Sequence, residues 1–91
     1  MKRVDANQPA IVSALRQVGA TVHVTSMIGN GFPDIVVGYR GTTFLFEIKD
    51  GQKVMSKRQL TGDEQIWHAN WQGHVAIVES IEDALQKIGA I

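Results

Sequence analysis

Two acidic residues and a lysine near the middle of the chain have the types and spacing of a metal-dependent hydrolytic site. Asp34 ends a Gly-Phe-Pro-Asp run, and Glu47 and Lys49 stand two positions apart in a later Phe-Glu-Ile-Lys run. Carboxylate oxygens suit Mg²⁺ and Mn²⁺, and such an ion can polarise a phosphoryl oxygen and activate a bound water. A nearby ammonium can orient that water or bind a phosphate. The three residues therefore predict phosphodiester hydrolysis.

This prediction depends on a β-hairpin that brings the three residues together. Residues 34–39 and 42–49 both have the pattern of strands, and residues 40–41 between them can form a two-residue turn. Counting outward from that turn places Asp34 opposite Glu47. Directly opposed residues point to one face of a sheet, with Cβ atoms about 4.5–5.5 Å apart.

The alternation of side chains along a strand extends this pairing to the lysine. Lys49 lies two residues beyond Glu47 and therefore points to the same face. A bulge in the turn would shift the pairing by one residue and move Asp34 to the other face. That other face receives the apolar residues Phe44, Phe46 and Ile48.

Both halves of the motif also have an ordinary structural interpretation. The segment 47–49 can be an exposed strand edge with alternating charges, and residues 33–34 can be a simple turn. Two opposed carboxylates repel each other, so a fold that keeps them together needs something to offset the cost. A divalent cation would do so, which favours the functional interpretation.

The rest of the chain predicts the elements that would hold the hairpin. Apolar residues repeat at helical spacing over 5–18, and an alternating, β-branched stretch indicates a strand over 20–26. Glycines and a proline mark 29–33 as the loop before the hairpin. A helix and a strand are therefore expected to precede the two hairpin strands.

A helix, a strand and a last helix are expected after the hairpin. The middle helix lies within 56–72 and begins at Ser56 or Thr61, since both fit the capping-box spacing. An apolar strand is expected over 74–78, with the last helix after it. The order is α-β-β-β-α-β-α, which predicts one α/β domain over 1–91, with helices covering a central mixed sheet.

Composition and charge limit the class of protein. The chain has no cysteine, which excludes disulfides and thiolate metal sites. Its nine basic and nine acidic residues cancel, which argues mildly against a nucleic-acid binder. A locally basic stretch can still contact phosphates, and it consists of Lys49, Lys53, Lys57 and Arg58.

The location expected from the sequence is intracellular. The start of the chain is polar and lacks the apolar core of a signal peptide. No apolar run reaches the roughly 20 residues of a membrane span. We therefore expect a cytoplasmic protein.

Other reactive side chains do not suggest a second site. The three histidines, His23, His68 and His74, fall on different expected elements, and no pair has the spacing of a helical metal site. The serines lack the context of a nucleophile elbow. The glycines of 29–31 precede a strand, whereas a phosphate-binding loop needs a helix there, so no nucleotide cofactor is expected.

The two runs around the hairpin, Gly31-Phe32-Pro33-Asp34 and Phe46-Glu47-Ile48-Lys49, resemble the PD-(D/E)xK nuclease motif. Within that superfamily the chain is similar to the VRR-NUC family. Further parts that carry the likeness are a helix with Gln65 and Trp67, then Gly73, the strand 75–78 and Ser80-Ile81-Glu82-Asp83-Ala84. The likeness covers nearly the whole chain, whose short length resembles that of stand-alone members often found in phage genomes.

The resemblance implies a restriction-endonuclease-like fold, dependence on Mg²⁺ or Mn²⁺, and cleavage of structured DNA. Four-way (Holliday) junctions are the favoured substrate, cut by a homodimer that presents two active sites. Trp67 and Trp71 stand one helical turn apart. We assign them to packing or, where exposed, to the dimer interface.

The resemblance also assigns roles to individual residues. Asp34 and Glu47 bind the metal with the carbonyl of Ile48, and Lys49 positions or activates water. Relatives often add an acid from the first helix, where this chain has Gln8, although Asp5 is close in sequence. A neutral amide can hold a metal-bound water without adding charge, so the number of metal ions stays open. The residues assigned to substrate contacts are Lys53, Lys57, Arg58 and Gln65, the last of which can equally be an ordinary surface position.

Two rival classes stay open. A nuclease-like domain without activity would bind DNA junctions without metal, and a structural phage protein or protein-interaction domain would need no site. The complete set of Asp34, Glu47 and Lys49 argues against both. Gln8 in place of an acid keeps the inactive nuclease-like domain open as an alternative.

Overall fold

The computed structural model describes residues 4–91, so residues 1–3, the first part of the polar start, lie outside the described part. The expected order of elements is confirmed, with one short 3-10 turn added. The elements are α1 (Gln8–Gln17), β1 (Thr21–Val24), β2 (Ile35–Tyr39), β3 (Thr42–Ile48), η1 (Met55–Lys57), α2 (Gly62–Asn70), β4 (Ala76–Val78) and α3 (Ile81–Ile88).

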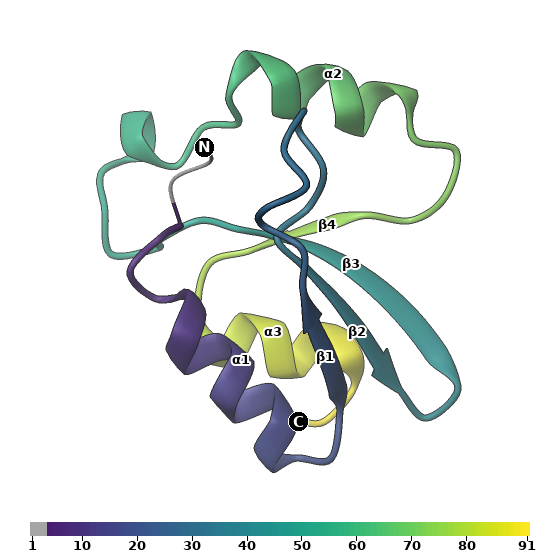
Figure 1. Ribbon diagram of the computed structural model, residues 1–91. Helices are drawn as coiled ribbons and strands as arrows, with labels where there is room; N and C mark the ends of the chain where they lie inside the picture. Colours follow the sequence, from purple (N-terminus) through teal and green to yellow (C-terminus); the bar gives the residue numbers. More distant parts are fainter. Residues whose placement is uncertain (1–3) are drawn as a thin grey trace.

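The four strands form one mixed sheet in the order β1-β2-β3-β4 (Figure 1). β1, β2 and β3 are antiparallel neighbours, whereas β4 runs parallel to β3. A parallel pair needs a crossover connection, and η1 and α2 lie in the segment that provides it. The expected mixed sheet is therefore confirmed.

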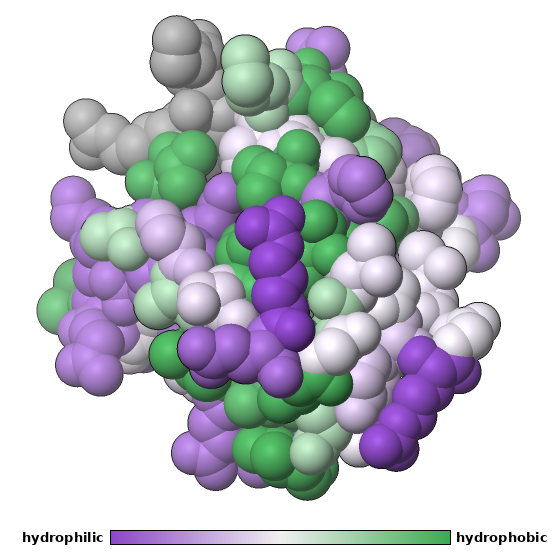
Figure 2. Space-filling model, turned by 60° about the horizontal axis from the view of Figure 1, so that its bottom comes forward, coloured by the Kyte–Doolittle hydropathy of each residue, from purple (hydrophilic) through white to green (hydrophobic). Residues whose placement is uncertain are grey.

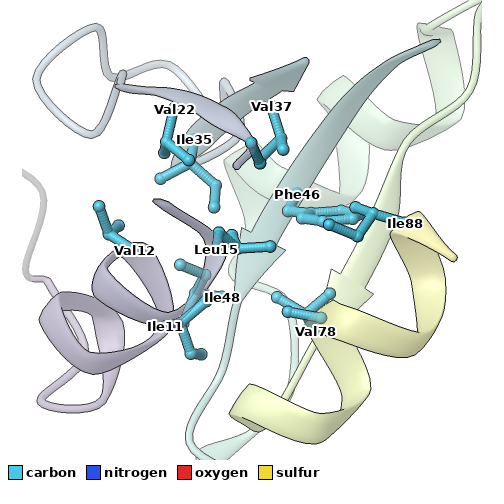
Figure 3. Packing of buried hydrophobic residues seen from close by; sticks show 12 residues of the cluster. Ile11, Val12, Leu15, Val22, Ile35, Val37, Phe46, Ile48, Val78 and Ile88 are labelled. Carbon is cyan, nitrogen blue, oxygen red and sulfur yellow. The ribbon is translucent and has the colours of Figure 1, made fainter. Parts of the chain in front are cut away.

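The hydrophobic core lies between the sheet and the pair α1 and α3. Ile11 and Leu15 of α1 are fully buried and point toward the strands (Figure 3). Phe46 and Ile48 of β3 are also fully buried, and Phe44 packs against the same cluster. The apolar side of the hairpin therefore lies where the alternation of residues placed it.

The middle helix α2 lies apart from α1 and α3, at the opposite end of the molecule as Figure 1 shows it. It begins at Thr61, whose side chain and that of Glu64 form a capping box, so the alternative start at Ser56 is wrong. Ser56 lies instead in η1. The ring of Trp67 stacks on Trp71 at 4.8 Å between centroids, which fits the packing role expected for the pair.

The surface over α1 and α3 mixes apolar and hydrophilic side chains (Figure 2). Single exposed apolar residues of this kind are common in folded proteins. Within residues 4–91, no helix combines the length and the apolar character that crossing a membrane requires.

Candidate functional site

A two-residue turn sets the register of the hairpin. Arg40 and Gly41 both have positive φ, at 49° and 80°, as type I′ turns require. Tyr39 pairs with Thr42 on either side of the turn, and the pairing continues without a bulge to the start of β2. The register expected from the sequence is therefore confirmed for the residues of β2, and a bulge in the turn is excluded.

At the far end of the hairpin Asp34 lies just beyond the paired strands and contacts the residues on either side of Glu47. The last pair of the ladder is Ile35 with Phe46. The amide of Asp34 donates to the carbonyl of that same Phe46 at 3.0 Å, so Asp34 leaves the regular pairing but stays against β3. The carboxylate of Asp34 in turn accepts from the amide of Ile48 at 2.7 Å.

Burial contradicts the alternative of an exposed strand edge. Glu47 and Lys49 are only 1% and 7% exposed, and Asp34 is 3% exposed. Charged side chains are almost never buried to this degree without partners. The ammonium of Lys49 lies 3.8 Å from the carboxylate of Glu47. The structure thus brings the three motif residues together inside the protein.

A further acid, Glu64, reaches the same place from α2. Its carboxylate accepts a hydrogen bond from the ammonium of Lys49 at 2.7 Å, and the same ammonium lies 3.8 Å from Glu47. It also accepts from the amide of Thr61 at 2.9 Å, which completes the capping box. One buried carboxyl group therefore joins the start of α2 to the end of β3.

The sequence contained a signal for Glu64, but it pointed to a different role. The Thr-x-x-Glu spacing from Thr61 to Glu64 predicts a helix start, which is confirmed, and gives no indication of a contact with Lys49. A lysine on a buried strand face needs an acidic partner, and that requirement could have directed attention to the next helix.

Ionisation of Glu64 is favoured despite its burial. Desolvation is the largest single influence and by itself raises the pKa of this carboxyl. The hydrogen bond from Lys49, the hydrogen bond from the amide of Thr61, the neighbouring Glu47 side chain and the charge of Lys49 act in the opposite direction. Together they lower the pKa of Glu64 from 4.5 to about 2. Glu64 is therefore a carboxylate at neutral pH.

Gln8 joins the site from the start of α1. Its amide donates to the hydroxyl of Ser26 at 3.1 Å, and Ser26 lies 3.4 Å from the carboxylate of Asp34. Gln8 is thus connected to Asp34 through one intervening side chain, which the sequence did not indicate. Asp5, the nearby acid, lies instead 3.7 Å from the ammonium of Lys53.

Every polar side chain that is buried within residues 4–91 belongs to this site. The set consists of Gln8, Ser26, Asp34, Glu47, Lys49 and Glu64. Such groups oppose folding unless they are paired, and no packing requirement explains why all of them gather at one place. The concentration is typical of a functional site.

A groove of about 760 Å³ opens at one side of this cluster, with Lys49 and Glu64 in its lining, whereas Asp34 and Glu47 lie beneath the surface outside that lining. Two of the four residues assigned to substrate contacts, Lys53 and Lys57, also line the groove. The other two lie outside its lining. The guanidinium of Arg58 bonds to Glu79 at 3.1 Å, and the side-chain amide of Gln65 donates to the backbone carbonyl of Leu60, just before α2, at 3.1 Å.

The donor atoms of the site suit a small divalent cation. Asp34 and Glu47 supply carboxylates, and the carbonyl of Ile48 points to the same side of β3 as its amide, which faces Asp34. Within the described residues no three His, Cys, Asp or Glu side chains are arranged as a metal site. One or two carboxylates completed by waters are the usual donors for Mg²⁺, so the set fits that ion.

Comparisons with known proteins identify no relative whose site could be compared with this one. No protein-family model matches the chain, and searches of curated proteins and of solved structures found no significant match. The functional interpretation therefore rests on the residues of the site and on the motif.

Proposed function

We propose that the protein is a metal-dependent DNA endonuclease with a restriction-endonuclease-like core of the VRR-NUC kind. The observation that supports this most strongly is the buried cluster at the end of the hairpin. It contains three carboxyl groups, those of Asp34, Glu47 and Glu64, and a single ammonium, that of Lys49. A divalent cation would neutralise the surplus of acidic groups, which otherwise opposes folding.

In this proposal Asp34, Glu47 and the carbonyl of Ile48 hold Mg²⁺ or Mn²⁺. When bound, the ion supplies a Lewis acid for the phosphoryl oxygen and lowers the pKa of a coordinated water. The amide of Ile48 and the hydroxyl of Ser26 keep the carboxylate of Asp34 in a fixed orientation. Gln8, which is hydrogen-bonded to Ser26, would hold a water bound to the metal and would add no negative charge to the site.

Lys49 positions the attacking water or the scissile phosphate. Its ammonium lies between two carboxylates, at 2.7 Å from Glu64 and 3.8 Å from Glu47. Two anionic partners restrict the rotation of a long side chain, and a positioned group accelerates a reaction more than a mobile one. Glu64 acts through Lys49 as a positioning residue.

The substrate is DNA, gripped in the groove at one side of the cluster. Lys53 and Lys57 are exposed on that groove, where Lys57 would contact a phosphate and Lys53 would do so on releasing Asp5. Arg58 could join them only after releasing Glu79. A four-way junction resolvase needs two sites, and a homodimer would provide them. The exposed Trp71, which directly follows α2, suits a dimer interface.

A DNA-binding module without activity is the second candidate. The observation that favours it is the neutral Gln8 at the position where an acid would complete a three-carboxylate metal site. Such a module would bind branched DNA equally well with and without divalent cations. The buried surplus of carboxyl groups favours the enzyme.

A cleavage panel tests the proposal. End-labelled single strand, duplex, flap and four-way junction are incubated in Mn²⁺ with wild type, Glu47→Gln and Lys49→Ala. We expect the wild type to cut at least one branched substrate, and both variants to lose at least about 100-fold in rate. Lys87→Ala, on an exposed part of α3, is the matched control and should cut normally. Equal cutting by the Lys49 variant would refute the proposal.

Circular dichroism and thermal unfolding of each variant separate lost chemistry from lost folding. A variant that keeps its spectrum and unfolds cooperatively is informative on activity. Junction binding without metal and without product, after long incubation of the wild type, would instead support the inactive module.

A further inference from the structure

Two consecutive apolar side chains stand in solvent on the groove. Met27 is 94% exposed and Ile28 is 56% exposed, and both line the groove together with Lys49 and Glu64. Single exposed apolar residues need no explanation. Two adjacent ones on the lining of a groove that also reaches Lys49 and Glu64 form a small apolar surface that can contact a partner.

The loop that carries Met27 and Ile28 is held firmly at its base. The amide of Thr25 donates to the carbonyl of Asp34 at 2.8 Å, and the Thr25 hydroxyl donates to that of Pro33 at 2.7 Å. The amide of Ile28 donates back to the carbonyl of Thr25 at 3.0 Å, which closes a turn. The two apolar side chains are thereby presented at a fixed place relative to Asp34.

Ser26 strengthens this connection. It directly precedes Met27, is 4% exposed, and its hydroxyl lies between Gln8 and the carboxylate of Asp34. One residue of the loop is thus part of the buried site while the next is in water. A single peptide unit therefore joins the exposed apolar pair to the side chain that contacts the Asp34 carboxylate.

The groove lining combines these apolar side chains with three lysines and three acids, and two of the lysines, Lys49 and Lys53, lie beside the acids Glu64 and Asp5. Met27 and Ile28 come from the loop between β1 and β2, whereas Lys53 and Lys57 come from the segment around η1. A nucleic-acid strand has the same division, because its bases have apolar faces and its backbone is anionic. Lysines match the phosphates, and aliphatic side chains match the faces of bases that are not stacked on a neighbour.

We propose that Met27 and Ile28 form an apolar wedge that packs against unstacked bases next to the scissile phosphate. This inference rests on the proposed nuclease function and names the substrate feature that the groove selects. Inserting side chains between bases requires that the bases separate, which is easiest at unpaired or branched positions. The wedge therefore favours DNA with a flap, gap or branch point over continuous duplex.

The test removes the wedge without touching the buried cluster. The double variant Met27→Ala, Ile28→Ala should fold as the wild type does, because both side chains are exposed. The matched control is Val54→Ala, Met55→Ala. These residues are 66% and 63% exposed and lie beside the lysine segment, but they are outside the groove lining.

The first readout is cleavage of the preferred branched substrate, whose cut position is mapped by end labelling. We expect kcat/KM to fall about 10- to 100-fold in the wedge variant, the range that base-packing contacts give, and less than about twofold in the control. On a substrate with abasic sites beside the cut, wild type and wedge variant should become equal. If the wedge variant loses as much kcat/KM on the abasic substrate as on the substrate with intact bases, the inference is overturned.

The second readout does not require cleavage. 2-Aminopurine placed beside the branch point of a DNA flap reports unstacking when the protein binds in Ca²⁺. We expect a fluorescence change with wild type and with the Val54, Met55 control, and little or none with the wedge variant. The same change with all three proteins would overturn the wedge, even where cleavage is normal. If the wild type does not cleave DNA but its fluorescence signal still depends on Met27 and Ile28, the proposed nuclease activity is refuted and the wedge is supported.

Discussion

Replacing Glu64 with glutamine would break a fully buried ion pair while preserving the shape of the side chain. The glutamine carbonyl can still accept from the amide of Thr61, so the start of α2 keeps its cap. The ammonium of Lys49 would then retain only one acidic neighbour, Glu47, at 3.8 Å. Removing one partner of a buried ion pair costs about 3–5 kcal/mol, because the other charge is left uncompensated.

The pKa of Glu64 gives a second estimate of the same cost. Folding lowers this pKa from 4.5 to about 2, which corresponds to about 3 kcal/mol of stability. Since the folded state has the lower pKa, this stability is fully present above pH 4.5 and is lost as the pH falls toward about 2. We therefore expect Glu64→Gln to be about 3 kcal/mol less stable than wild type at neutral pH, with a smaller difference in acid.

Urea denaturation in metal-free buffer at pH 7 and at pH 3 measures this difference. At pH 3 it should fall to about half or less of its value at pH 7. Asp63→Asn, in the same first turn of α2 but exposed, is the matched control and should cost no more than about 1 kcal/mol. A difference below about 1 kcal/mol at pH 7, or one that does not change at pH 3, would refute the reasoning.

Two further predictions concern the segments that hold the site together. A Cβ at Gly31 would lie 2.7 Å from the carbonyl carbon at the start of α2, whereas one at Gly29 meets nothing, and φ is positive at both. In thermal unfolding Gly31→Ala should therefore cost about 1–3 kcal/mol more than Gly29→Ala, and equal losses would exclude the close approach. Ser26→Ala should cost about 1–2 kcal/mol by removing the link between Gln8 and Asp34, and an unchanged midpoint would show that this link adds nothing.

The order of elements and the hairpin register could be predicted because both depend on local patterns. The turn at Arg40 and Gly41 has two residues, and the pairing of every following position follows from that length. The ladder ends at Ile35 and Phe46, and Asp34 then contacts the residues on either side of Glu47, close to where counting along the sequence placed it. The strand alternation also placed Phe46 in the core, where it is fully buried.

The third acid and the shape of the groove could not be predicted, because they depend on how distant segments pack. Glu64 meets Lys49 only because α2 returns over the end of β3, and nothing local in the helix indicates that position. Arg58 and Lys57 are neighbours with similar charge, yet Arg58 pairs with Glu79 while Lys57 lines the groove. Tertiary contacts decide between such equivalent residues.

Titration of Mn²⁺ into the protein by isothermal calorimetry tests the central claim most directly, since it needs no choice of DNA. Wild type is compared with Asp34→Asn, which keeps an oxygen that can accept from the amide of Ile48 and should stay folded. We expect the wild type to bind Mn²⁺ and the variant to bind it at least about tenfold more weakly. No binding by folded wild type, or equal binding by both proteins, would contradict a metal site built on Asp34 and Glu47.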